Sequence, residues 1–154
     1  MKITMLGTGN ATVTECYNTC FVLSGEGKHL LVDGGGGNTV LRRLKQAGTD
    51  WKDIRDIFVT HKHIDHLLGI IWMARMICQN MSRGTYDSEA RIYAHDEVIA
   101  LIDDMARKLP GAKESAFMGK RLPLLPVGRG QGPQVIGRKF ATFRLPSSIT
   151  TAVR

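Results

Sequence analysis

Residues 60–69 read THKHIDHLLG and place three of the chain's five histidines, together with an aspartate, within six positions. The preceding run, DIFVT at residues 56–60, predicts a short buried strand, and the mostly apolar residues 67–81 predict a helix that ends near Gly84. In an extended chain His61 and His63 point the same way, because they are two residues apart. Asp65 and His66 then fall in the first helical turn, so all four side chains can reach one small region.

These residue types are typical of a metal site. Neutral imidazole and carboxylate are good ligands for Zn2+ and related first-row ions. Two-metal hydrolytic sites hold their ions about 3.5–4 Å apart and can lower the pKa of a bound water to about 7. The spacing therefore predicts that His61 and His63 reach one metal, while Asp65 and His66 supply a second. The alternative is a polar helix cap beside which three histidines happen to lie.

The flanking sequence predicts a mixed α/β fold. We expect strands at residues 2–6, 18–23, 29–33 and 91–94. We expect helices after Asn38 and Asp96, which would cap them. The glycine run at residues 34–37 lacks the Lys-Ser/Thr of a phosphate-binding P-loop and predicts a tight turn instead. Beyond Lys120, prolines and glycines interrupt the pattern, and only residues 135–136 and 140–145 predict further short strands.

Three apolar residues of the residue 67–81 helix, Trp72, Met73 and Met76, lie at helical spacing and predict core positions. His95 ends one predicted strand and His29 begins another, and we expect both on the surface. Cys16, Cys20 and Cys78 are too few and too odd in number for a disulfide framework, which favours free thiols in a reducing cytoplasm.

The charge of the chain is unevenly distributed. The 154 residues are 43% hydrophobic and 23% charged, with a formal net charge of +7, as in a globular domain. Residues 1–114 contain 14 basic and 14 acidic residues, whereas residues 115–154 contain seven basic residues and no acidic one. We therefore predict a domain segment at residues 1–120 and a basic, Pro/Gly-rich tail at residues 121–154. One alternative is a nucleic-acid-binding module that uses this tail.

Segments that would direct the chain to a membrane are not found in the sequence. The N-terminal apolar run is too short for a signal peptide, and no stretch reaches the roughly 18 apolar residues of a spanning helix. We therefore expect a cytoplasmic protein without a membrane partner, and a homodimer is compatible with the sequence.

Three motifs resemble one known family. THKHIDHLLG at residues 60–69 resembles the H-x-H-x-D-H signature of the metallo-β-lactamase superfamily, and LLVDGG at residues 30–35 resembles that family's first motif. MLGTG at residues 5–9 is similar to the start of the ribonuclease Z branch, whose members process tRNA 3′ ends. The motifs share the family's order over about residues 1–110. The resemblance implies a four-layer αββα sandwich with the site at the sheet edges, of which this chain carries the N-terminal half.

The resemblance also implies residue roles. His61 and His63 would hold the first metal, and Asp65 and His66 the second. Asp65 would also orient the attacking water, and Asp33 would hydrogen-bond to the metal-site loop. The metals would be two Zn2+, with Mn2+ or Fe2+ as alternatives. The family pattern further requires a third His, a bridging Asp and a final His. This sequence has no histidine after residue 95 and no carboxylate side chain after residue 114.

The expected function is therefore that of a metal-dependent hydrolase, a phosphodiesterase acting on RNA or a small phosphodiester, impaired in this short chain. A thioester hydrolase of the glyoxalase type is an enzymatic alternative that the motif does not exclude. A second alternative is a non-catalytic remnant, truncated or frame-disrupted, with an unrelated tail. The abrupt change in charge and the missing ligands motivate it.

Overall fold

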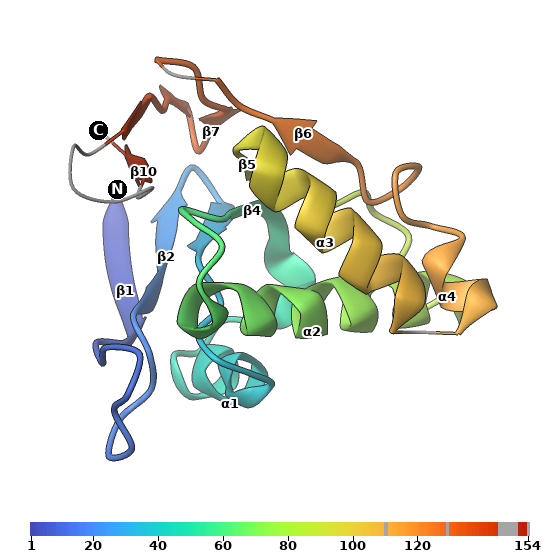
Figure 1. The fold of residues 1–154 in the computed structure, drawn as a ribbon, viewed down its shortest axis with the longest axis horizontal. Coiled ribbons are helices and arrows are strands. Elements are labelled where there is room, and N and C mark those ends of the chain that lie inside the picture. The colour runs from blue at the N-terminus through green and yellow to red at the C-terminus, as the bar shows by residue number, and fades with distance from the viewer. Residues whose placement is uncertain (110, 129, 145–150, 154) are drawn as a thin grey trace.

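The centre of the molecule is a six-stranded sheet in the order β1-β2-β3-β4-β5-β6 (Figure 1). A computed structural model describes residues 1–109, 111–128, 130–144 and 151–153. In this model β1, β2 and β3 pair antiparallel, and β4, β5 and β6 continue the sheet in parallel from β3. The strands are β1 (Lys2–Gly7), β2 (Cys20–Gly25), β3 (Lys28–Val32), β4 (Ile54–Phe58), β5 (Arg91–Ala94) and β6 (Leu124–Pro126).

The connections follow from this topology. Gly25 pairs with Lys28, so the two residues between them, Glu26 and Gly27, form a tight turn, and both have a positive φ. Parallel neighbours need crossovers, which helices provide. The crossover elements are α1 (Thr39–Gln46) with the 3₁₀ helix η1 (Trp51–Asp53), α2 (Ile64–Ser82), and α3 (Asp96–Lys108) with α4 (Ala112–Ser115).

The two faces of the sheet carry different clusters of apolar side chains. Leu31 and Ile57 face the helices, where they join the main core with Ile70 of α2. Their neighbours on β3 and β4 point to the opposite face, because side chains alternate along a strand. That face holds a smaller cluster that includes Phe58 and residues from 135 to 140. One sheet with one helical layer is the architecture expected for the N-terminal half of an αββα sandwich.

The chain beyond residue 120 takes part in this fold. β6 is the sixth strand of the sheet, and β7 (Gln134–Val135) pairs with β8 (Arg138–Lys139) beside the smaller cluster. β9 (Thr142–Arg144) pairs with β10 (Thr151–Val153). The strand predicted at residues 140–145 is therefore shorter than expected, and its last residue lies outside the described residues.

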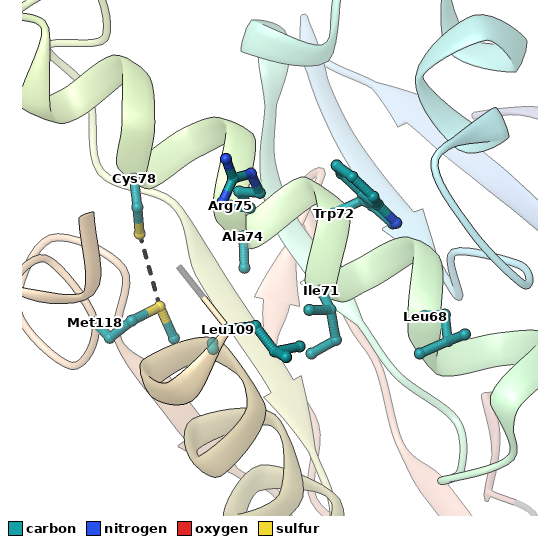
Figure 2. A pocket seen from close by; sticks show the side chains of 9 residues that line it. Leu68, Ile71, Trp72, Ala74, Arg75, Cys78, Leu109 and Met118 are labelled. Atoms are coloured by element: carbon teal, nitrogen blue, oxygen red, sulfur yellow. Dashed lines mark hydrogen bonds between the residues drawn. The ribbon is translucent and has the colours of Figure 1, made fainter. Parts of the chain in front are cut away.

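Asn38 occupies the predicted N-cap position of α1, although its side chain makes no capping hydrogen bond. Two other local expectations are wrong. The N-cap of α3 is His95 rather than Asp96, which lies in the first turn. Trp72 is 41% exposed, because apolar residues occur on most sides of α2 and only one side can face the sheet. Its ring lines an apolar pocket of about 360 Å³ between α2 and the end of α3 (Figure 2).

Of the two histidines predicted on the surface, one is exposed and the other is half-buried. His95 is exposed, whereas His29 is half-buried, with Nδ1 2.8 Å from the hydroxyl of Ser24. Within the described ranges, no helix is both long enough and apolar enough to cross a membrane.

Candidate metal centre

The predicted site residues meet at one edge of the sheet. β3 and β4 are parallel neighbours, so the residues that follow them emerge at the same edge. Asp33 follows β3, and His61 lies three residues beyond the end of β4. The chain stays extended through His63, and α2 begins at Ile64. Asp65 and His66 therefore stand in the first turn of α2, as the sequence predicted.

Asp33 ties the two strand ends to the helix. It is 4% exposed and adopts φ 57°, a left-handed conformation that aspartate tolerates better than most residues. Its Oδ1 accepts a hydrogen bond from the backbone N–H of Thr60 at 2.8 Å. Its Oδ2 accepts from the Thr60 hydroxyl and from Nδ1 of His66, both at 2.7 Å. One carboxylate thus fixes the loop after β4 and the first turn of α2.

These bonds determine which ring nitrogens carry hydrogen. The Thr60 hydroxyl has one hydrogen and gives it to Asp33, so it accepts from Nδ1–H of His61 at 2.9 Å. His61 Nε2 then carries a lone pair, which accepts from Nδ1–H of His63 at 3.1 Å. His66 donates through Nδ1, which leaves its Nε2 3.3 Å from Oδ2 of Asp65. The ring centroids of His61 and His66 are 4.1 Å apart.

Burial and neighbouring charges shift the pKa values of His61 and His66 in opposite directions. Burial lowers the pKa of His61, and the neighbouring His66 lowers it further. Burial also acts to lower the pKa of His66, but the hydrogen bond and charge of Asp33, with the charge of Asp65, outweigh it and raise that pKa. His61 is therefore the neutral imidazole at pH 7, which is the protonation state that binds a metal ion.

The glycine turn before α1 is held against this edge by Tyr17. The buried Tyr17 hydroxyl lies 2.7 Å from the carbonyl oxygens of both Gly34 and Gly37, and burial raises its pKa to about 12. Gly35 has φ 69°, and a side chain there would collide with the Tyr17 ring. The amide of Gly36 donates to Oδ1 of Asn18 at 3.1 Å. These contacts agree with the predicted tight turn.

The donor atoms fit a metal ion in type but not in number. Imidazole Nε2 atoms and a carboxylate suit a divalent first-row ion. Among the residues that the structure describes, however, no group of three or more His, Cys, Asp or Glu side chains is arranged to hold an ion. His61 and His63 instead contact each other directly. The described residues therefore supply an incomplete donor set for a metal ion.

Two residues with clear roles at this edge were not singled out from the sequence. Thr60 connects Asp33 to His61, and Tyr17 connects the loop after β1 to the glycine turn. Thr60 stands directly before the histidine motif, so a hydroxyl at the end of the predicted strand was a usable signal. Tyr17 acts 17 and 20 residues away in sequence, and no local pattern indicates such a contact.

Comparison with known proteins identifies the family. The family model described as anti-Pycsar protein Apyc1 matches residues 1–112. The chain belongs to this family. Among curated proteins, this chain is similar to ribonuclease Z of Haloferax volcanii. The two are 39% identical over 71 residues, which are 46% of this chain and 22% of that protein. Apyc1 of Paenibacillus xerothermodurans is 37% identical over 70 residues, 46% of this chain and 27% of that protein.

Solved structures show the fold. The metallo-β-lactamase fold protein YhfI from Bacillus subtilis superposes with a TM-score of 0.72 at 17% identity, covering 99% of this chain and 57% of that one. The short form of human tRNase Z gives a TM-score of 0.67 at 21% identity, covering 98% and 61%. The predicted metallo-β-lactamase fold class is confirmed, and the predicted resemblance to ribonuclease Z is confirmed by the curated relatives. This chain spans about a quarter of the length of the curated relatives that it matches. It covers less than two-thirds of the length of the two solved chains.

Proposed function

We propose that this chain carries part of the active centre of a metal-dependent phosphodiester hydrolase. The observation that carries the proposal is the hydrogen-bond chain from Asp33, which reaches His66 directly and His61 through Thr60 and so fixes the tautomers of two adjacent imidazole rings. Buried carboxylates that orient histidines in this way are typical partners of metal ligands. The names of the relatives, ribonuclease Z and tRNase Z, favour RNA as the substrate class.

In this proposal the residues divide the work as the sequence predicted. His61 and His63 would hold one ion, and Asp65 with His66 a second. A bound divalent ion would polarise the phosphoryl group and make an attacking water more acidic. Asp65, whose carboxylate is buried at the helix start, would orient that water and accept its proton. Asp33 would act through His66 and Thr60 and would not touch the substrate.

Full activity would require ligands that this sequence does not contain. A four-coordinate site around His61 and His63 lacks two protein ligands or their substitutes. We therefore expect this chain by itself to bind Zn2+ weakly and to turn over little substrate.

Zinc titration and two hydrolysis assays test the proposal. We expect less than one zinc per chain, lost in His61→Ala and Asp65→Asn and kept in His29→Gln, a control at the opposite end of β3. Slow hydrolysis of bis(p-nitrophenyl) phosphate that depends on Asp65 would support the phosphodiesterase. Hydrolysis of a glutathione thioester alone would favour the glyoxalase-type alternative. Zinc binding that survives both site substitutions would overturn the proposal.

A further inference from the structure

A groove of about 620 Å³ lies beside α1, away from the histidine cluster. Its walls come from Leu41, Arg42 and Lys45 of α1, from the segment between Gly48 and Trp51, and from Met76 of α2. The side chains that we assign to the metal centre do not line it. The groove is thus a separate feature. The helices α1 and α2, which contribute to its walls, lie beside the sheet in Figure 1.

One wall of the groove is strongly basic. α1 has the sequence TVLRRLKQ, with three cations and no acidic residue. Val40 and Leu44 are buried in the core, so the exposed Arg42 and Lys45 point outward and line the groove. Neither forms an ion pair with another residue in the part of the chain that the structure describes. Exposed cations without acidic partners attract anionic groups such as phosphates.

One carboxylate lines the groove, that of Asp50, and it accepts a backbone hydrogen bond. Its Oδ1 accepts a hydrogen bond from the backbone N–H of Lys52 at 3.0 Å and so caps the 3₁₀ helix η1. Lys52 adds a further cation, with Nζ 5.8 Å from the Trp51 ring centroid. Positive charge therefore predominates around the groove.

The other wall offers a rigid aromatic surface. Trp51 is partly exposed and lines the groove, and its indole stacks on Tyr86 with ring centroids 6.0 Å apart and planes at 11°. The stack holds the orientation of the indole ring. An aromatic face beside cations is how proteins bind single-stranded nucleic acid, because bases stack on the ring while phosphates pair with the cations.

The distance from the groove to the histidine cluster determines how long a ligand must be to reach both. Met76 lies eleven residues beyond Asp65 on α2, which is about 16 Å at 1.5 Å per residue. A small phosphodiester at the cluster does not span that distance, whereas an oligonucleotide does. We propose that this groove binds single-stranded RNA next to the cleaved phosphodiester, with a base on Trp51 and phosphates on Arg42 and Lys45. The link to cleavage rests on the proposed function, but the binding itself does not.

The two tryptophans of the chain allow a matched fluorescence test. Trp72→Phe leaves Trp51 as the only indole, and Trp51→Phe leaves Trp72, which lines a different pocket (Figure 2). We expect a short oligouridylate to quench Trp51 saturably and to leave Trp72 fluorescence unchanged. Equal quenching of both indoles, or of neither, would overturn the proposal.

Charge variants test the phosphate contacts. Arg42→Gln with Lys45→Gln should weaken RNA binding about tenfold and lower the slope of log Kd against log salt by about 1.4, since each contact to a single strand contributes roughly 0.7. Arg83→Gln with Lys113→Gln removes the same charge from exposed positions elsewhere and should change affinity less than about twofold. Equal losses in both pairs would refute a specific groove.

These measurements need no metal and no turnover, so failure of the proposed hydrolysis leaves them valid. Conversely, the Arg42 and Lys45 variants should leave hydrolysis of bis(p-nitrophenyl) phosphate unchanged, because that substrate does not reach the groove. Binding of the unchanged chain to anionic phosphatidylserine vesicles, lost in the same variants and without Trp51 quenching by RNA, would assign the groove to a membrane surface and overturn the RNA proposal.

Discussion

Replacing Gly69 by alanine should separate α2 from the turn that follows β3. The two segments are in backbone contact: the amide of Gly34 donates to the carbonyl of His66 at 2.8 Å, and the amide of Gly69 donates to the carbonyl of Gly35 at 2.9 Å. A Cβ on Gly69 would overlap the carbonyl group of Gly34, which cannot move aside because it is backbone. Overpacking costs about 1–3 kcal/mol, and each lost hydrogen bond costs about 1 kcal/mol.

The expected loss for Gly69→Ala is therefore about 4 kcal/mol of unfolding free energy, or about 12 °C in Tm for a chain of this length. Gly37→Ala is the matched control, because a Cβ there meets nothing within 4 Å, and it should stay within about 0.5 kcal/mol. Thermal and urea unfolding followed by circular dichroism measure both. Equal Tm values for the two variants would refute the close packing of α2 on the turn.

Four further outcomes follow from the site and the core. Asp33→Asn removes the charge that orients the ligands, so zinc affinity measured against a competing dye should fall about 10–100-fold, and unchanged affinity would contradict the assigned role. Tyr17→Phe removes a hydrogen bond to the glycine turn and should cost about 1 kcal/mol, measured as a lower urea midpoint. Burial raises the pKa of the thiols of Cys20 and Cys78 to about 12 and about 11, so at pH 8 a thiol reagent should titrate only the exposed Cys16, and three thiols after unfolding. Because these buried thiols stay protonated while unfolded ones ionise near their ordinary value of 9.0, stability should fall as pH rises above about 9, and a flat urea midpoint from pH 8 to pH 10 would contradict that.

Much of the fold was predictable because its signals are local. The β2–β3 hairpin follows from apolar strands around Glu26 and Gly27, and α1 follows from apolar residues at helical spacing. β6 was missed because Pro123 and Pro126 disfavour a strand. Proline is nevertheless tolerated at a sheet edge, where one side of the backbone has no partner strand, and β6 is such an edge strand.

The site was predictable to the extent that one short motif contains it. The spacing of His61, Asp65 and His66 placed them together because a strand end and a helix start fix their directions. The contact between Asp33 and His66 spans 33 residues and depends on the parallel pairing of β3 with β4, which periodicity alone does not specify. The sequence therefore predicted which residues gather, and the structure adds the bonds that hold them.

The bonds from Asp33 also have a thermodynamic consequence. Directly at His66, and through the Thr60 hydroxyl at His61, they restrict ring rotation in the folded chain before any ion arrives. Immobilising a side chain at a binding site costs about 0.5–1.5 kcal/mol, so here the ordering entropy is lost during folding rather than during ligand capture. A variant that loosens Asp33 would shift that entropy loss back to binding, and its folding stability and ion affinity should decline together.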